Sequence, residues 1–332
     1  MKNLWSDTES DNFKDDLALR VYTSRLLGKD PSLVLHGGGN TSVKITETNL
    51  VGSKEEILYV KGSGWDLVSI EKDGFSPVRM SHMLKLSKLK SLSDPQMVNE
   101  LKTQLTNAAS PTPSVETILH AILPFKYVDH THADAVVTIS NTSDGEKRIR
   151  EIYGNRVVIV PYVMPGFDLA KEVDRLFSEL ASDETEGMVL LNHGMFSFGS
   201  TARKSYDRMI DLVNLAEQYL VSQNACDNEE IVSNIKSKKI RNDVSQLRQK
   251  VSSVAGNPFL LNLTNSQLGA SFSNRKDVEV IATRGPLTPD HVIRTKRIPM
   301  IGRDVEKYVK EYISYFNTHK ANAKEKKTML DP

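Results

Sequence analysis

The sequence predicts one α/β domain over residues 1–224, followed by a smaller α+β lobe over residues 225–318. Two observations support this division. Through residue 224, short apolar runs typical of strands alternate with longer segments whose apolar residues recur every three or four positions, as in amphipathic helices. Residues 227–257 are charged and polar, so the pattern changes there. The basic segment 319–332 is expected to be a flexible tail.

The first half of the domain carries clear helix and strand patterns. Helices are predicted at 12–27, at 83–92 and from Ser114 through His120, and strands at 41–45 and 57–60. The helical segments repeat apolar residues at helical spacing, whereas the strand segments are short apolar runs beside glycine-rich loops. Ser114 is the expected N-cap of its helix, because a serine hydroxyl can accept a free backbone N–H group at that position.

The second half of the domain and the lobe are assigned by the same patterns. Strands are predicted at 127–132, 136–139, 157–160 and 188–191, and helices at 145–152, 168–180 and 202–221. In the lobe, strands are predicted at 259–263 and 278–282, and an amphipathic helix at 305–316. The domain therefore mixes sheet and helix along its whole length.

Composition excludes several classes of protein. Lys and Arg number 43 against 42 Asp and Glu, which gives no reason to expect a nucleic-acid partner or a membrane surface. Residues 1–16 lack the apolar core of a signal peptide, and no run approaches the roughly 18 apolar residues of a membrane span. Cys226 is the only cysteine, so neither an internal disulfide nor a thiolate metal cluster is possible. A cytoplasmic enzyme is the simplest expectation.

The main indication of chemistry is a pair of histidines one residue apart, His130 and His132, in a predicted strand. Residues i and i+2 of a strand point to the same face, about 6.6 Å apart at roughly 3.3 Å per residue, so both rings can lean toward one ion. His193 follows another predicted strand, between Asn192 and Gly194. Such a pair is more often structural than metal-binding, and both interpretations stay open on spacing alone.

Carboxylates near these histidines have several possible roles. Glu116 lies one turn before His120 on the predicted helix, where it could bind a metal ion or act as a base, or could simply be an exposed helix residue. His120 is better explained as a packing or hydrogen-bonding residue than as a ligand. Asp129 and Asp134 flank the histidine pair and are expected to be surface charges or partners of the ligands rather than ligands.

Three elements of the sequence could bind an anion. The loop from Gly37 to Ser42 is not a dinucleotide fingerprint, because a strand follows it, but successive small residues can turn their N–H groups toward an anion. Gly62-Ser63-Gly64 is a second such loop, and Ser114 adds a hydroxyl at a helix N-terminus. Each is weak alone, and together they suggest a phosphorylated small substrate. The basic residues Arg284, Arg294, Lys296 and Arg297 are expected to form a solvated face, and an anion site is the less favoured alternative.

These motifs together resemble the zinc-dependent class II aldolase/adducin family. The matching stretches, in the family's order, are Gly39-Asn40-Thr41-Ser42, Gly62-Ser63-Gly64, Ser114-Val115-Glu116 with His120, His130-Thr131-His132 and Asn192-His193-Gly194. They cover residues 12–224. The longer runs 36–44, 114–137 and 284–297 are most similar to the aldolase part of the bifunctional rhamnulose-1-phosphate aldolase/alcohol dehydrogenase. No dehydrogenase activity is expected of residues 1–332.

The resemblance implies a three-layer α/β fold, with a central, mainly antiparallel sheet flanked by helices, and a role for each motif. His130, His132 and His193 would hold Zn²⁺, and Glu116 would be a ligand that swings away and becomes the general acid/base. The substrate phosphate would bind Gly39, Asn40, Ser63, Gly64 and Ser114. Val115 stands where aldolases of this family often carry a second serine, and no residue matches the tyrosine that some members supply from a neighbouring subunit. A homo-oligomer, commonly a tetramer, is expected.

The implied reaction is metal-dependent aldol cleavage of a ketose 1-phosphate, with rhamnulose 1-phosphate expected, to dihydroxyacetone phosphate and an aldehyde through a zinc-stabilised enediolate. Within the same fold, a dehydratase or an epimerase acting on a pentulose phosphate is an alternative. A non-catalytic interaction module of the adducin type is a second alternative, from another class. Such modules are expected to lack the metal histidines, which this chain retains together with Glu116.

Overall fold

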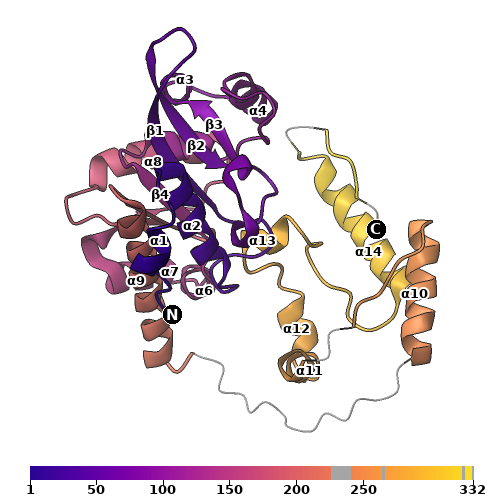
Figure 1. Ribbon diagram of the computed structural model, residues 1–332. Coiled ribbons are helices and arrows are strands. Elements are labelled where there is room, and N and C mark those ends of the chain that lie inside the picture. Colours follow the sequence, from indigo (N-terminus) through magenta and orange to yellow (C-terminus); the bar gives the residue numbers. More distant parts are fainter. Residues whose placement is uncertain (226–240, 264–265, 324–325, 331–332) are drawn as a thin grey trace. The chain divides into compact units, whose positions relative to one another are not determined.

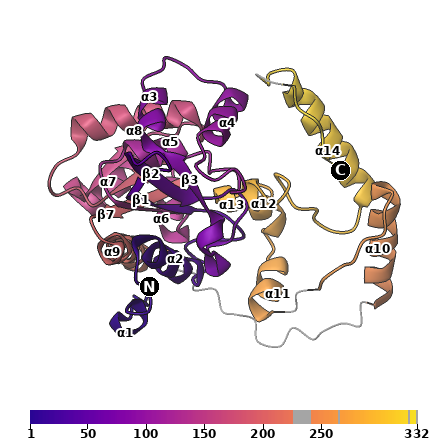
Figure 2. The same ribbon diagram turned by 45° about the horizontal axis from the view of Figure 1, so that its top comes forward.

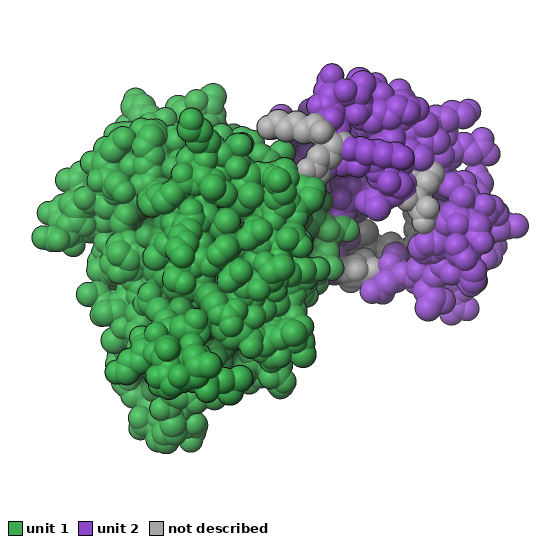
Figure 3. Space-filling view, turned by 90° about the horizontal axis from the view of Figure 1, so that it is seen from above, with its two compact units in different colours: residues 1–226, 287–294 green, residues 227–286, 295–332 purple. Residues whose placement is uncertain are grey.

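The computed structural model describes residues 1–225, 241–263, 266–323 and 326–330. The chain divides into two compact units, which Figure 3 colours separately. One unit comprises Met1–Cys226 together with Leu287–Arg294, and the other comprises Asp227–Pro286 and Thr295–Pro332. The short segment Leu287–Arg294 therefore belongs to the unit formed by the N-terminal part of the chain.

A seven-stranded sheet forms the centre of the first unit, with the order β3-β2-β1-β4-β7-β6-β5. Its strands are β1 (Asn40–Thr48), β2 (Lys54–Lys61), β3 (Phe75–Arg79), β4 (Tyr127–Thr131), β5 (Val157–Val160), β6 (Gly187–Leu190) and β7 (Gly194–Gly199). Every neighbouring pair is antiparallel except β5 and β6. The predicted mainly antiparallel sheet is confirmed.

Helices cover both faces of this sheet, which gives three layers (Figures 1 and 2). One face carries α2 (Asp16–Gly28), α6 (Asp134–Ser140), α7 (Gly145–Tyr153) and α9 (Ala202–Ser222), and the other carries α3 (Met80–Leu86), α4 (Asp94–Thr103), α5 (Thr117–Ile122) and α8 (Phe167–Leu180). Each face buries its own apolar core: Leu26 and Val213 pack in the first, and Ile118 and Val173 in the second. Burial on both faces holds the strand ends in fixed positions.

Local signals account for several helix boundaries. Asp15 caps α2 by accepting from the Ala18 N–H group, and Thr201 caps α9 in the same way. Ser93 and Gln96 form a capping box at the start of α4, a helix that the sequence analysis did not predict. The remaining short elements of this unit are the helix α1 (Asp7–Ser10) and the 3₁₀ turns η1 (Leu67–Ser69), η2 (Lys72–Gly74) and η3 (Gly154–Arg156).

Three predictions in the first unit differ from the structure. The helix predicted at 83–92 is α3, which begins at Met80 and ends at Leu86. The strand predicted at 136–139 is part of α6: its β-branched residues favour a strand by propensity, but they bury one face of a helix beside α9. The helix predicted to start after Ser114 begins at Thr117, with Glu116 at the N-cap position. Ser114 instead accepts a hydrogen bond from the Glu116 N–H group at 3.3 Å.

The described residues of the second unit form helices joined by irregular segments, with no strand among them. They form α10 (Arg241–Ala255), α11 (Gln267–Ser273), α12 (Val278–Ala282) and α14 (Val305–Lys320), whereas α13 (Pro289–Val292) lies in the first unit. The α+β lobe predicted for 225–318 is therefore wrong in its strands. Residues 278–282 form α12. Such a short apolar run is compatible with the spacing of a helix and with that of a strand, so the pattern alone did not decide between them. Residues 259–263 form no strand: Phe259 instead bonds Ser252 and Arg248 of α10. The helix predicted at 305–316 is confirmed.

Among the described residues, no helix combines the length and the hydropathy that a transmembrane span requires.

Candidate metal centre and active-site pocket

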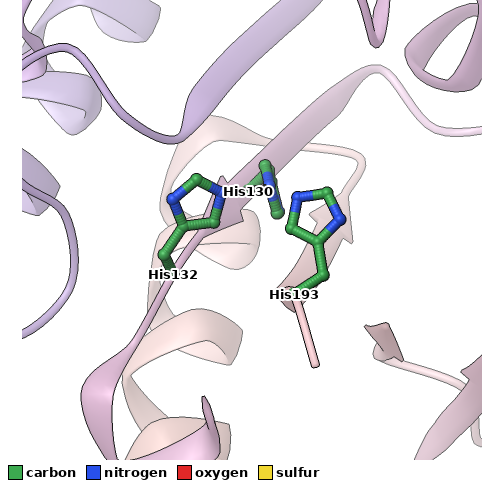
Figure 4. A group of neighbouring side chains, drawn as sticks. All are labelled: His130, His132 and His193. Atoms are coloured by element: carbon green, nitrogen blue, oxygen red, sulfur yellow. Dashed lines mark hydrogen bonds between the residues drawn. The ribbon is translucent and has the colours of Figure 1, made fainter. Parts of the chain in front are cut away.

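Three imidazoles converge at one end of the sheet (Figure 4). His130 is on β4, His132 follows the end of that strand, and His193 lies in the turn between β6 and β7. One ring nitrogen from each lies within 4.8 Å of the others, and the Nε2 atoms of His130 and His132 are 3.0 Å apart. A tetrahedral zinc ion with bonds of about 2.0–2.1 Å holds its ligand nitrogens about 3.4 Å apart. The predicted ligands are therefore brought together in a group of the size that one ion requires.

Two residues of the turn before β7, Asn192 and Gly194, allow its backbone to pass close to the histidine pair. Asn192 has a positive φ of 60°, which asparagine tolerates better than most residues. A Cβ on Gly194 would lie 2.3 Å from the Thr131 carbonyl oxygen and 3.1 Å from the His132 ring. Only glycine lets β7 approach the histidine pair so closely. The Asn192-His193-Gly194 motif thus explains how His193 reaches the other two rings.

Hydrogen bonds on the far side of two rings show which nitrogens are free. His130 Nδ1 faces the Met195 carbonyl oxygen at 3.0 Å, and His132 Nδ1 faces the Asp290 carboxylate at 2.7 Å. Because these oxygens accept, each contact places a proton on Nδ1, and the two Nε2 atoms face each other at 3.0 Å. Nitrogens at that distance can share a proton or bind one metal ion. Burial lowers the pKa of His130 and of His193 to about 4, so both are neutral at pH 7, as metal ligands must be.

Glu116 completes the donor set. Its Oε1 and Oε2 atoms lie 3.5 Å from the Nε2 atoms of His193 and His130, respectively. Burial opposes ionisation, but the neighbouring His130 and His193 rings and the hydrogen bond from Asn40 lower the pKa of Glu116 below its ordinary value. Oε1 has no hydrogen-bond partner. An ionised, buried oxygen without a partner fits a cation that the three imidazoles could hold.

A chain of hydrogen bonds fixes the orientation of Glu116. Asn40 Nδ2 donates to Glu116 Oε2 at 2.6 Å, and the Asn40 carbonyl oxygen accepts from His120 Nε2. Ser42 Oγ then donates to His120 Nδ1 at 2.7 Å. Burial lowers the pKa of His120 to about 3, so the ring is neutral. His120 therefore orients the Asn40 amide and is not one of the grouped imidazoles, as the sequence analysis expected.

A pocket of about 410 Å³ opens beside this group. Its wall includes all five residues expected to bind phosphate (Gly39, Asn40, Ser63, Gly64 and Ser114), together with Glu116, His132 and His193. The structure thus brings the sequence-predicted site residues to one place. His130 is fully buried behind the wall.

Two positively charged side chains in the pocket wall, Lys61 and Arg294, were not predicted as part of the site. Lys61 is buried and donates to the Gly37 carbonyl oxygen at 2.8 Å, and burial lowers its pKa to about 8. Arg294 Nε donates to the His36 carbonyl oxygen at 2.8 Å, and its Nη2 atom lies 2.8 Å from where a Cβ on Gly37 would be. Arg294 therefore does not belong to a featureless solvated face. Lys296 and Arg297 instead stack on Tyr312 and Tyr315 in the second unit.

The carboxylate that accepts a hydrogen bond from His132 is one that sequence reasoning missed. Asp129 lies on the opposite face of the sheet, paired with Arg20 at 2.5 Å and bonded to Ser205. Asp134 starts α6 and bonds none of the three rings. Asp290 contacts His132 from 158 positions along the chain. No local pattern indicates such a contact, and only the extended similarity over 284–297 pointed to this part of the chain.

Comparisons with known proteins agree with this geometry. The family model for the class II aldolase and adducin N-terminal domain matches residues 18–220, and the model for the second domain of class II aldolases matches 238–332. The chain is 31% identical over 349 residues to an uncharacterized oxidoreductase, YuxG, of Bacillus subtilis, covering 95% of this chain and 49% of that protein. The chain thus spans about half the length of this curated relative.

A solved structure gives the same result for the first unit. The N-terminal class II aldolase domain of a conserved protein from Thermoplasma acidophilum is 45% identical, with a TM-score of 0.61, and the match covers 66% of this chain and 99% of that one. The resemblance found in the sequence is confirmed at the level of the family, and its closeness to the rhamnulose-specific enzyme stays a prediction. This chain belongs to the class II aldolase and adducin family.

Proposed function

We propose that this protein is a zinc-dependent aldolase that cleaves a ketose 1-phosphate, with rhamnulose 1-phosphate as the first candidate, to dihydroxyacetone phosphate and an aldehyde. One observation carries the proposal. Three imidazoles and the oxygen of an ionised Glu116 that has no hydrogen-bond partner meet at the wall of a pocket, and the same wall carries two positively charged side chains. The volume of about 410 Å³ is within the range of small-molecule sites.

Zinc is proposed to be held by His130, His132 and His193, with Glu116 as a ligand before substrate binds. When bound, such an ion supplies Lewis-acid stabilisation of negative charge on the ketone fragment. Neutral His130 and His193 would leave the positive charge on the ion, and burial of the site would strengthen its effect on nearby oxygens.

Glu116 is the proposed general acid/base. In the direction of synthesis, its carboxylate takes a proton from C3 of dihydroxyacetone phosphate, and the C3 electron pair forms the C3–C4 bond to the aldehyde. Cleavage is the reverse: the C4 hydroxyl gives its proton to water, C4 becomes the aldehyde carbonyl as the C3–C4 bond breaks, and protonated Glu116 gives its proton to C3 and then regains one from water. Asn40 holds Oε2 at 2.6 Å, so Oε1 is the atom free to carry that proton.

The phosphate is proposed to bind at Gly39, Asn40, Ser63, Gly64 and Ser114, next to the positively charged Lys61 and Arg294 side chains. Phosphate oxygens accept strongly from backbone N–H groups, hydroxyls and guanidinium groups. This binding energy would hold the reacting carbons beside Glu116. Two positively charged side chains in the pocket wall favour an anionic substrate over a neutral sugar.

The direct test is a panel of ketose 1-phosphates incubated with the zinc-loaded protein, with release of dihydroxyacetone phosphate as the readout. Release from at least one substrate, abolished by Glu116→Gln, supports the proposal. Absence of release from every substrate, with epimerised or dehydrated pentulose phosphate as the product instead, identifies the alternative enzymes. Less than about a tenth of an equivalent of zinc in the purified protein would favour a non-catalytic adducin-like module. A tetramer, as proposed from the family, is checked by light scattering.

A further inference from the structure

The segment Leu287–Arg294 belongs to the unit that carries the histidines, although the chain on both sides of it belongs to the other unit. Hydrogen bonds attach it beside the pocket. The Leu287 carbonyl oxygen accepts from Asn141 at 3.1 Å, Arg294 donates to the His36 carbonyl oxygen at 2.8 Å, and Asp290 accepts from His132 at 2.7 Å. The segment lies within the range matched by the second-domain family model.

Asp290 is the buried centre of this attachment, with 3% of its surface exposed. Its Oδ1 atom accepts from His132 Nδ1, and its Oδ2 atom accepts from the Leu35 N–H group at 3.0 Å. A Cβ on Gly38 would lie 1.3 Å from Oδ1, so only glycine at that position leaves room for the carboxylate. Both oxygens therefore have a defined partner, and the loop before β1 is shaped around them.

We propose that Asp290 is the positioning residue of the metal centre: it holds His132 in the tautomer whose Nε2 lone pair faces the ion. This inference rests on the proposed metal-dependent function. A carboxylate on the far nitrogen of a ligating histidine fixes the orientation of the ring and raises its basicity, and removing such a partner typically weakens metal binding 10- to 100-fold. Residues 1–224 alone would then contain all three imidazoles and still lack part of what makes them a tight site.

A purely structural role for Asp290 predicts different results. If Asp290 served only to attach the segment, its replacement would lower stability without changing the protonation of the His132 ring. Asp290→Ala is the sharpest variant, because it removes both acceptor oxygens and adds no donor. An amide would not decide the question, because its oxygen could stay toward His132 and leave only the bond to Leu35 without an acceptor. Asp134→Ala is the matched control: it removes a neighbouring carboxylate that bonds none of the three rings.

Two measurements test the inference. Long-range ¹H–¹⁵N spectra of the zinc-free protein report the tautomer of His132, whose signals are identified by their loss in His132→Ala. Competition with a chromogenic chelator gives the zinc affinity. We expect His132 to be protonated on Nδ1 in the natural protein and in Asp134→Ala. In Asp290→Ala, that preference is lost and zinc binds 10- to 100-fold more weakly.

An unchanged tautomer with a zinc affinity within twofold of the natural protein in Asp290→Ala would overturn the inference. So would a natural protein whose His132 carries its proton on Nε2, a result that needs no variant to fold. If the natural protein binds no zinc at all, the proposed function fails, while the tautomer measurement still decides whether Asp290 controls the His132 ring.

Discussion

Asn40 and His130 are directly opposed across the antiparallel β1–β4 pair. This register places the Asn40 amide beside the first histidine and within 2.6 Å of Glu116, which comes from a different part of the chain. Because side chains alternate between the two faces of a sheet, a shift of one residue would turn His130 toward α2. The pairing of two strands therefore brings a metal ligand and the proposed acid/base together.

Replacing Glu116 by Gln should separate metal binding from turnover. The amide keeps the shape of the side chain but cannot carry the proton, so kcat should fall by about 10²–10⁴. The three imidazoles are unchanged, so we expect the zinc content to stay near one equivalent. Turnover and metal content are measured on the same preparation. Near-normal turnover would show that another group moves the proton.

Replacing His132 by Ala should remove both zinc and cleavage. The variant takes one of three nitrogen donors and leaves the Asp290 carboxylate buried without its partner, which also costs about 1–3 kcal/mol or more of stability. Zinc analysis and thermal unfolding check these two effects. The control is His319→Ala, an exposed histidine of α14. A full equivalent of tightly bound zinc in His132→Ala would rule out this residue as a ligand.

Replacing Arg294 by Met should weaken substrate binding with little effect on the metal. A hydrogen bond to a charged group contributes about 1.5–3 kcal/mol, so KM for the ketose 1-phosphate should rise roughly 10- to 150-fold. Lys296→Met is the matched control, because Lys296 lies against Tyr312 and outside the pocket wall. Equal KM values for the two variants would remove Arg294 from the anion site.

The pH dependence of anion binding should reflect Lys61. Burial lowers its pKa to about 8, so its ammonium group is charged below pH 8 and becomes neutral as the pH rises above that value. Sulfate keeps its charge over this range and should inhibit progressively less between pH 7 and pH 9.5. For Lys61→Met, the inhibition constant of sulfate should be larger at pH 7 and should change less with pH. Parallel pH profiles for both proteins would assign the dependence to another group.

The sequence predicted much of the fold because helix and strand patterns are local. The strand around His130 and the long helix α9 follow from apolar periodicity within single segments. The errors fell where that signal is ambiguous. The short β-branched runs in α6 and α12 suit either period, and packing decided for the helix.

By itself the sequence determined the chemistry that is available: three histidines, a glutamate and small-residue loops in an order typical of class II aldolases. Only the tertiary structure decided how these groups are held. In the folded chain, the carboxylate that accepts from His132 is that of Asp290, 158 positions away, and not that of the nearer Asp129 or Asp134. Arg294 likewise lies in the pocket wall. The physical reason is that a hydrogen bond between buried groups depends on which surfaces pack together, and packing between distant segments leaves no periodic trace in the chain.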